Sequence, residues 1–396
     1  MKRRWWCLAA LTSARAAIGF QFQSVAAVGP LVSSDLGMDK AQFGWLVGLY
    51  LLPGVVFALP GGLLGQRYGD KRLVLIGLAL MAAGGAWLAL AGSFAEATAA
   101  RFLSGIGAVM LNVLVAKMVA DWFDGNERLL AMSVLINSWP VGIGLALLAA
   151  APLGQLAGWP WAIASSALFA AIGFVIVLVI YQAPTPSAAE AAPTRVGLGV
   201  LTRREWRLLL IGSLPWLLYN AAFQIVTSFL PSFFVGSGYG IAHSSSLVAL
   251  TTVFFVVGVQ AGGVWLKHAR HPDLICHAAI AGWCATLLFV AAGSTPWPWL
   301  VLGGVVGGLP AAALISVPAE FLRAESRGAG MGVFFTVYYL GCAILPGLAG
   351  KLYDLGGGGA ALAMAIVIAL GGALCLRLFR SAMTRPGAAD LTGSTA

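Results

Sequence analysis

The chain has 396 residues, of which 60% are hydrophobic and only 9% are charged, and its mean hydropathy is +0.91. Soluble domains carry roughly 25% charged residues, so this composition excludes a water-soluble enzyme. It also excludes disordered, collagen-like and disulfide-rich secreted chains. In a soluble protein the net charge of +9 would suggest nucleic-acid binding. In a membrane protein it fits cytoplasmic loops rich in Lys and Arg, and we expect no nucleic-acid partner.

Twelve apolar runs follow one another along the chain, each about as long as the 20 or so residues that a membrane-spanning helix needs. They cover residues 6–32, 42–64, 73–92, 96–120, 129–150, 160–181, 208–232, 245–266, 274–293, 298–319, 328–349 and 360–379. Proline residues inside several runs are compatible with membrane helices, because neighbouring helices can satisfy the freed backbone groups. The predicted fold class is therefore an all-α integral membrane protein whose twelve transmembrane helices lie in the lipid bilayer.

The basic residues define an orientation. If both termini lie in the cytoplasm, the 23 Lys and Arg residues fall on the inner side, except for Lys40 and Lys351 outside and Arg15 and Arg101 within helices. Such an excess of basic residues is typical of cytoplasmic loops. We therefore predict a multi-pass protein of the inner (plasma) membrane with both termini cytoplasmic. A cleavable signal peptide is the alternative for the start of the chain, but apolar sequence continues past Arg15 to Val32.

An internal repeat relates the two ends of the chain. At an offset of 201 residues Gln23 matches Gln224, and at an offset of 199 Gly142 matches Gly341. Between them lies a stretch of Pro, Ser, Ala and charged residues that is typical of a linker. We predict three parts: an N-terminal six-helix bundle at 1–181, a cytoplasmic linker at 182–206, and a C-terminal six-helix bundle with a short cytoplasmic tail at 207–396. Two parallel six-helix halves form one known transporter architecture, with the substrate site near the midplane between them.

Two motifs carry a family resemblance. Residues 62–72 read Gly-Leu-Leu-Gly-Gln-Arg-Tyr-Gly-Asp-Lys-Arg, and residues 101–105 read Arg-Phe-Leu-Ser-Gly. Both resemble signatures of the major facilitator superfamily, which implies twelve helices in two pseudo-symmetric bundles. The resemblance also implies gating or structural roles for Gly62, Gln66, Arg67, Gly69, Arg72, Arg101 and Gly105. Gln66 stands where the superfamily usually has Asp, so we expect a weaker lock between the two halves on the cytoplasmic side.

A finer resemblance is to the cyanate, nitroimidazole and nitrate/nitrite-like porters of bacteria, and it rests on residues 44–54, 117–123 and 137–142. Pro140, in the last of these segments, is a further candidate for a gating or structural role. The resemblance implies a small anion or small polar solute as the substrate and a bacterial inner membrane as the location. We expect a monomer without a cofactor. We also expect no bound metal, because the five cysteines and four histidines lack metal-ligand spacing.

Arg15 is the most deeply placed charge of the sequence. It lies about ten residues into the first run, or about 15 Å of helical rise, which is too deep for its head group to reach water fully. Burying Arg at mid-helix costs ~2.5–3.5 kcal/mol on insertion scales, and such residues usually face a water-filled cavity. We interpret it as a clamp for an anionic substrate, because its planar fork suits carboxylate-like partners. The alternative is a structural Arg paired with backbone carbonyls or a neighbouring acid. Gln23 lies on the same face of the helix and is a second binding candidate.

Further candidates for substrate binding lie on the fourth, fifth, seventh and eleventh runs. They are Asn112, Asn137, Tyr219, Asn220, Gln224, Tyr338 and Tyr339. In the superfamily that the chain resembles, helices one, four, seven and ten line the cavity. For the amides, hydrogen bonds that join two helices are an equal alternative to ligand contact. For Tyr338 and Tyr339 the alternative is packing in the core.

The fourteen acidic residues all map to loops or helix ends. A proton-coupled transporter commonly buries a titrating carboxylate, so a proton-driven multidrug or small-molecule exporter of the same superfamily is our second hypothesis. The leading hypothesis is a secondary active or facilitative transporter that moves a small anionic or polar solute by alternating access. A membrane-embedded enzyme or sensor is a remote alternative, because a hydrolase needs a nucleophile with a base, or a metal cluster. We therefore predict no enzymatic activity.

Overall fold

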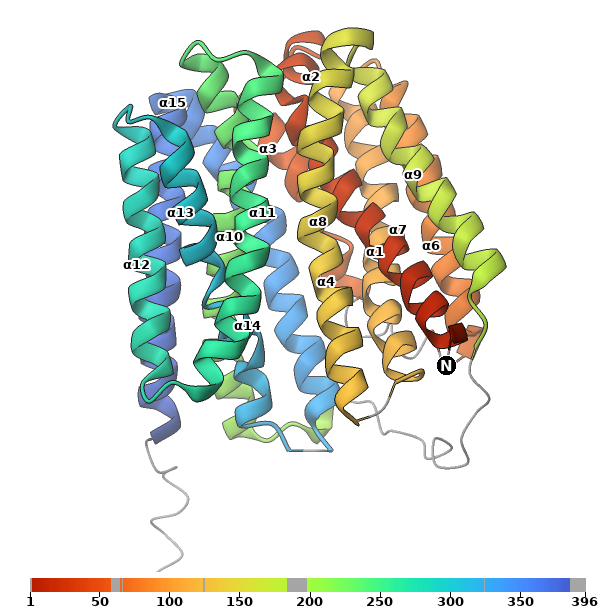
Figure 1. Cartoon of the computed structure of the whole chain (residues 1–396), viewed down its shortest axis with the longest axis vertical. Helices are drawn as coiled ribbons and strands as arrows, with labels where there is room; N and C mark the ends of the chain where they lie inside the picture. The colour runs from red at the N-terminus through yellow and green to blue at the C-terminus, as the bar shows by residue number, and fades with distance from the viewer. Residues whose placement is uncertain are drawn as a thin grey trace, which may run out of the picture.

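In a computed structural model of the chain, residues 2–57, 65, 67–123, 125–183, 198–323 and 325–384 are described. They form long helices that run roughly along the longest axis of the molecule (Figure 1). The helices of residues 2–180 occupy the right-hand side of that view, and those of residues 203–384 occupy the left-hand side. The first residue of the first helix and the last residue of the last helix lie at the same, lower end, which we call the terminal end.

The described residues of the first half form four long apolar helices, one bent helix pair and two shorter helices. Its helices are α1 (Lys2–Ala27), α2 (Gly29–Asp35), α3 (Lys40–Gly48), α4 (Gly54–Phe57), α6 (Asp70–Ala89), α7 (Phe94–Ala120), α8 (Gly125–Ala157) and α9 (Trp159–Ile180). Together α1 and α2 make one span, which bends by 59° where they join. Pro30 stands in the first turn of α2, where its missing N–H leaves no helix carbonyl without a donor.

The second half repeats the arrangement. Its helices are η2 (Leu198–Val200), α10 (Arg203–Gly236), α11 (Ile241–His268), α12 (Pro272–Ala291), α13 (Pro296–Gly308), α14 (Ala311–Ser316), η3 (Val317–Glu320) and α15 (Arg327–Thr384). Within the 58 residues of α15, Gly357 has φ of 73°, a left-handed conformation that favours glycine and divides α15 into two spans.

The structure agrees with the predicted fold class. Within the described part of the chain, nine helices are individually long and apolar enough to cross a membrane, and the bent pair α1 and α2 adds a tenth. The break at Gly357 makes two spans of α15, and α3 with α4 covers the described part of the predicted run 42–64. The predicted run 360–379 lies inside the second part of α15. Parts of the predicted linker and tail lie outside the described residues.

Close helix crossings hold each half together. In the first half α1 crosses α8 so closely that a Cβ on Gly19 would collide with the carbonyl oxygen of Trp139, and one on Gly142 with that of Ala16. In the second half a Cβ on Gly341 would collide with Leu217 of α10. Gly341 and Leu217 are the repeat partners of Gly142 and Ala16 at the offsets of 199 and 201. The repeat seen in the sequence is therefore a repeat of helix contacts.

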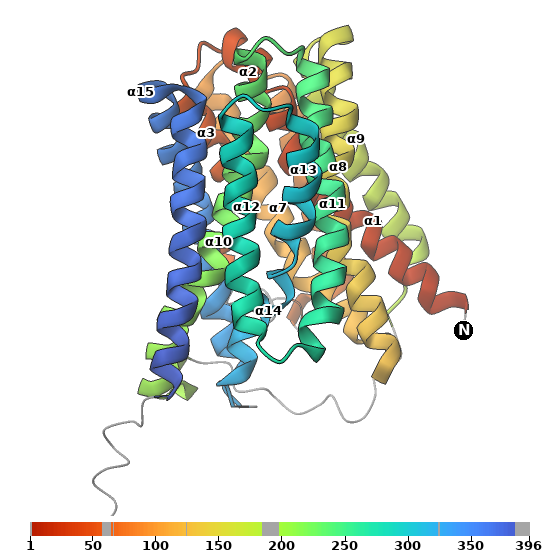
Figure 2. The same cartoon turned by 60° about the vertical axis from the view of Figure 1, so that its left-hand side comes forward.

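The two halves meet at the end opposite the terminal end, where α3 lies against the first part of α15 (Figures 1 and 2). A Cβ on Gly44 would collide with the carbonyl oxygen of Pro346, and one on Gly48 with that of Ala343. Beside these glycines the Asp354 carboxylate accepts hydrogen bonds from the backbone N–H groups of Lys40 and Ala41, each 2.9 Å long. These contacts close the far end of the space between the halves.

Candidate functional site

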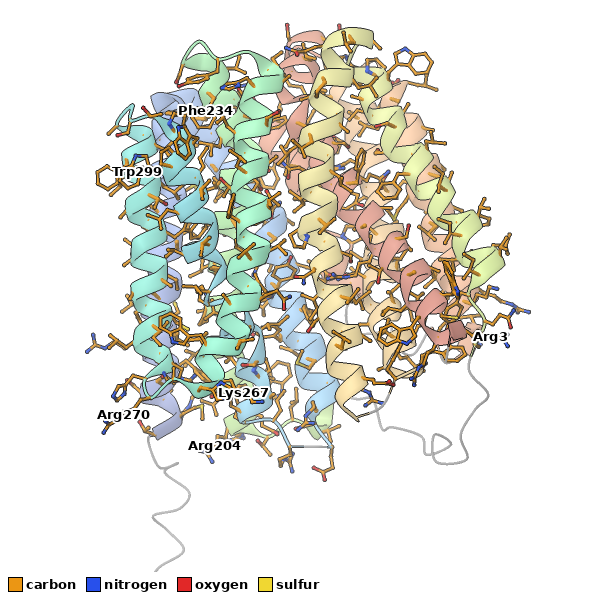
Figure 3. All side chains as sticks on the ribbon, in the orientation of Figure 1. Arg3, Arg204, Phe234, Lys267, Arg270 and Trp299 are labelled. Atoms are coloured by element: carbon orange, nitrogen blue, oxygen red, sulfur yellow. The ribbon has the colours of Figure 1, made fainter. Side chains whose placement is uncertain are left out.

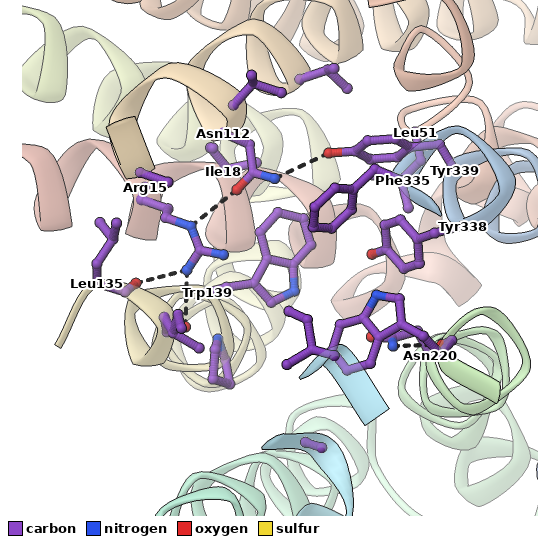
Figure 4. A pocket seen from close by; sticks show the side chains of 18 of the residues that line it. Arg15, Ile18, Leu51, Asn112, Leu135, Trp139, Asn220, Phe335, Tyr338 and Tyr339 are labelled. Carbon is purple, nitrogen blue, oxygen red and sulfur yellow. Dashed lines mark hydrogen bonds between the residues drawn. The ribbon is translucent and has the colours of Figure 1, made fainter. Parts of the chain in front are cut away.

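A cavity of about 600 Å³ lies between the two halves. Toward the terminal end it extends to Ala116, Met132 and Gly328, while the contacts of α3 with α15 close the opposite end. Seven of the predicted binding residues line it: Arg15, Asn112, Asn137, Tyr219, Asn220, Tyr338 and Tyr339. In Figure 4 the labelled members of this set converge from α1, α7, α10 and α15; they are Arg15, Asn112, Asn220, Tyr338 and Tyr339. Pro140, predicted as a gating or structural residue, lines it as well.

Arg15 is the one charged side chain among the described residues that line the cavity. Its Nη1 donates to the carbonyl oxygens of Leu135 at 2.7 Å and Ile136 at 2.9 Å, and lies 3.5 Å from the Ser138 hydroxyl. Its Nε donates to Asn112 Oδ1 at 3.0 Å (Figure 4). The guanidinium is therefore held by neutral acceptors that orient it without cancelling its charge.

Pro140 explains why α8 can offer a carbonyl to Arg15. In a regular helix the carbonyl of Ile136 would accept from the backbone N–H of residue 140, and proline has none. The Ile136 carbonyl is left without its helical donor, and Arg15 Nη1 supplies one. The close crossing of α1 with α8 at Gly19 and Gly142 brings the guanidinium within reach.

Asn112 connects Arg15 to the other half of the molecule. While its Oδ1 accepts from Arg15, its Nδ2 donates to the Tyr339 hydroxyl at 3.1 Å. Asn112 belongs to α7 of the first half, and Tyr339 belongs to α15 of the second. One planar amide thus joins the cavity's cation to the opposite wall.

Aromatic rings form the wall that faces Arg15 (Figure 4). The Tyr338 ring lies 6.2 Å from the rings of Trp216 and Phe335 and 5.0 Å from that of Tyr339. The rings of Tyr219 and Phe255 are stacked, with centroids 6.3 Å apart. This wall is suited to an apolar or aromatic body.

The cavity is chemically asymmetric although its scaffold is repeated. At the offset of 201 the repeat partner of Arg15 is Trp216, and at the offset of 199 that of Tyr338 is Trp139. All four side chains line the cavity. The repeat therefore places a cation on one side and an indole at the matching position on the other.

Two polar atoms of the lining have no hydrogen-bond partner within the described part of the chain. They are the acceptor Asn137 Oδ1 and the donor Trp216 Nε1, both inaccessible to bulk solvent. Buried polar atoms in proteins nearly always have a partner. These two atoms are exceptions among the described residues of the lining.

Comparison with known proteins identifies the family. The family model described as Major Facilitator Superfamily matches residues 11–346. The chain belongs to the major facilitator superfamily. Its members transport solutes, and the 3-(3-hydroxy-phenyl)propionate transporter of Escherichia coli is 27% identical over 360 residues, covering 86% of this chain and 85% of that protein.

Other similar proteins are matched less completely. The hexuronate transporter of Bacillus subtilis is 22% identical over 274 residues, which cover 64% of each chain. The efflux pump terG of Aspergillus terreus is 26% identical over 315 residues, covering 70% of this chain and 57% of that protein. The solved D-xylose-proton symporter has a TM-score of 0.76 at 12% identity, covering 95% of this chain and 98% of that one, and shows the fold alone. The chain is thus a solute transporter of the superfamily.

Two predicted binding residues of this superfamily member lie outside the cavity. Gln23 is fully buried, and its Nε2 donates to the carbonyl oxygen of Thr227 at 2.8 Å across the two halves. Gln224 is 4% exposed and lines a small second cavity of about 20 Å³, which shares Trp139, Asn220 and Tyr338 with the larger one. The helical stripe that predicted them gives the correct face of α1 and α10, but the halves already touch at this level.

Arg101, on the second superfamily motif, has a structural position. Its side chain is fully buried and donates to the carbonyl oxygens of Leu46 at 3.2 Å, Gln21 at 2.8 Å and Phe22 at 2.7 Å. Its guanidinium carbon lies 4.3 Å from the centre of the Tyr50 ring. A Cβ on Gly105, in the same motif, would collide with the Tyr50 carbonyl oxygen. Neither residue lines the cavity in this structure.

The described residues include only part of the first superfamily motif at 62–72. Gly62 and Gln66 lie outside them. Gly69 has φ of 87° and precedes α6, a backbone conformation that favours glycine. Arg67 and Arg72 are exposed, and the Arg67 guanidinium lies over the ring of its neighbour Tyr68. The expected weak cytoplasmic lock therefore stays a prediction.

Proposed function

We propose that this transporter moves a small organic anion, and that it does so without enzymatic activity. The observation that supports the proposal is Arg15, a cation on the wall of a cavity whose other described lining residues are uncharged. The acceptors that hold it are carbonyl and amide oxygens, so the guanidinium keeps its full positive charge. An anion that enters is attracted to this charge, and a carboxylate can match the planar fork of the guanidinium.

The size and lining of the cavity favour an organic solute over a small inorganic anion. Pockets of roughly 300–1,000 Å³ are typical of sites that enclose drug-sized ligands, and this cavity measures about 600 Å³. Nitrate or cyanate would contact Arg15 and leave the aromatic wall uncovered. The relatives from E. coli and B. subtilis are named for a propionate and a hexuronate, which are both carboxylates. We therefore place the substrate among organic carboxylates rather than in the cyanate and nitrate branch.

The proposed orientation puts the terminal end in the cytoplasm of a bacterial cell. Basic side chains gather there, among them Arg3, Arg204, Lys267 and Arg270, while the labelled aromatic residues Phe234 and Trp299 lie at the other end (Figure 3). Cytoplasmic ends of membrane proteins carry such an excess of Lys and Arg. The cavity then opens to the cytoplasm, and the structure represents an inward-facing state.

A ligand panel on the purified protein tests the substrate charge. Phenylpropionate, phenylpropionamide and phenylpropylamine share one carbon skeleton and differ in charge. A bound ligand raises the unfolding temperature by mass action, so we expect phenylpropionate to raise it and the neutral and cationic compounds to leave it unchanged. Nitrate is expected to have little effect at the same concentration. Stabilisation by the amine without stabilisation by the carboxylate would instead support the exporter hypothesis.

A further inference from the structure

The guanidinium of Arg15 has one side that a carboxylate can occupy. Arginine carries five N–H donors in a fixed plane. Nη1 donates to the carbonyl oxygens of Leu135 and Ile136 and lies 3.5 Å from the Ser138 hydroxyl, and Nε donates to Asn112 Oδ1. Within the described part of the chain no hydrogen bond from Nη2 is recorded. A carboxylate that binds through both of its oxygens and leaves the bonds of Nη1 to α8 in place takes the edge formed by Nη2 and Nε.

Asn112 Oδ1 stands in the way of this two-point contact, because it accepts from Nε at 3.0 Å. The two carbonyls on Nη1 belong to the backbone of α8 and cannot be moved aside by a ligand. Asn112 is a partly buried side chain on the wall of the cavity, and its amide can rotate. A carboxylate–guanidinium fork makes two bonds between charged partners, so it is stronger than the single bond from the guanidinium to a neutral amide that it would replace.

We propose that Asn112 is a positioning residue which the substrate carboxylate displaces from Arg15, and that this displacement releases the second half of the transporter. The inference rests on the proposed function, since it needs an anion at Arg15. The same planar amide donates through Nδ2 to Tyr339 on α15 at 3.1 Å. Turning Oδ1 away from Nε also turns Nδ2 away from the Tyr339 hydroxyl. Binding in one half thereby removes a hydrogen bond to the other.

Substrate binding and the hydrogen bond between Asn112 and Tyr339 must affect each other equally. If the substrate weakens the bridge between Asn112 and Tyr339, the bridge weakens substrate binding by the same factor. Removing the bridge therefore strengthens carboxylate binding, which is the opposite of what the loss of a direct contact or a structural support would do. A negative charge at position 112 has the reverse effect, because it would pair permanently with Arg15 and compete with the substrate.

Phenylpropionate binding to the full-length purified protein tests the inference with four variants. We expect Tyr339→Phe and Asn112→Ala to bind it about two- to tenfold more tightly, the range for losing one neutral hydrogen bond. Asn112→Asp is expected to bind at least tenfold more weakly. Tyr353→Phe removes a hydroxyl from the same helix outside the cavity lining and serves as the matched control. Melting temperatures of the ligand-free variants report whether each one folds.

The outcomes distinguish a failure of the proposed displacement from a failure of the proposed function. Weaker binding by all three of Asn112→Ala, Tyr339→Phe and Asn112→Asp would overturn the displacement. A fifth variant, Arg15→Ala, tests the proposed function separately. If Arg15→Ala abolishes binding, the proposed function stands even when the displacement does not. Binding of phenylpropionate that is unaffected by Arg15→Ala, or no binding of carboxylates to the parental protein, would overturn the proposed function and this inference together. Opposite effects of Ala and Asp at position 112, with parental binding by Tyr353→Phe, would support the inference.

Discussion

At the scale of single residues, the cavity depends on how one arginine is held. Arg15 is oriented by two backbone carbonyls and one amide, and no carboxylate belongs to the described cavity lining. The sequence left two interpretations open for Arg15, a ligand clamp and a partner of backbone carbonyls. The structure shows the carbonyl partners, which take Nη1, and among the described residues no hydrogen bond from Nη2 is seen. Its role in binding stays a prediction.

Substituting Pro140 tests how the arginine is positioned. Pro140→Ala restores the N–H that the Ile136 carbonyl lacks, so this carbonyl can bond within α8 and hold Arg15 less firmly. We expect the affinity for carboxylates to fall about two- to tenfold, the range for one weakened hydrogen bond, with normal protein levels. Binding of phenylpropionate measures the effect. Pro152→Ala, the other proline inside α8 and outside the cavity lining, is the control and should keep the parental affinity.

At the scale of helices, each half has an ion pair at the terminal end of its first span. In the first half Arg4 of α1 pairs with Glu127 of α8 at 2.6 Å. In the second half Glu205 of α10 accepts from Arg323 at 3.2 Å and from Ser326, next to the start of α15. Glu205 is the repeat partner of Arg4 at the offset of 201. Each half thus fastens the start of its first span with an ion pair, to α8 in the first half and to the segment before α15 in the second.

The contact between α3 and α15 at the far end is expected to stabilise the closed outer side. Asp354 accepts from the first two N–H groups of α3, where the helix dipole also favours a negative charge. Asp354→Asn removes the charge and one acceptor oxygen, so we expect the population to shift toward the outward-open state about three- to tenfold.

Labelling of a cysteine at position 227 measures this shift. Thr227 is fully buried between the halves, so a Thr227→Cys thiol should react with an impermeant reagent only when the outer side opens. We expect faster labelling in the Asp354→Asn background. Glu96→Gln removes an exposed carboxylate whose bond to Gly92 stays within the first half, and it should not change the rate. Equal labelling of all three proteins would show that Asp354 does not hold the outer side closed.

The helices could be predicted closely from the sequence, whereas the depth of the cavity could not. Apolar runs at 73–92 and 96–120 correspond to α6 at Asp70–Ala89 and α7 at Phe94–Ala120, because hydropathy and span length fix where a helix enters and leaves the membrane. Helical periodicity gives the face on which Gln23 lies but not the level at which the two halves meet. It also could not show that Asn112 reaches Tyr339, since that bond joins residues 227 positions apart.

At the scale of the whole molecule, two repeated bundles enclose a cavity that is cationic on one side and aromatic on the other. The end opposite the terminal end is closed by α3 and α15, and the cavity extends toward the terminal end. Alternating access requires a second state in which these relations are reversed. The repeat supplies the scaffold for both states, and under our proposal the unlike residues Arg15 and Trp216 at matching positions give the cavity its selectivity.

The orientation of the molecule can be measured with reporters fused after Ala396. A fusion that is active only in the cytoplasm should be active, and one that is active only in the periplasm should be silent, because the basic side chains gather at the terminal end. A second pair of fusions after Leu156, at the opposite end of α8, is expected to give the reverse pattern. A periplasmic signal from Ala396 would contradict the proposed inward-facing state.

Uptake of phenylpropionate into liposomes that contain Arg15→Ala, Arg15→Lys or the parental protein tests the central claim most directly. Truncating one partner of a buried charge pair costs about 2–5 kcal/mol, so Arg15→Ala should lose more than tenfold in transport at low substrate concentration. Arg15→Lys keeps the charge without the fork and should fall between the two. Arg204→Ala, an exposed arginine at the terminal end, is the control and should transport at the parental rate. Parental transport by Arg15→Ala, in liposomes with equal amounts of folded protein, would contradict the claim that Arg15 binds the transported anion.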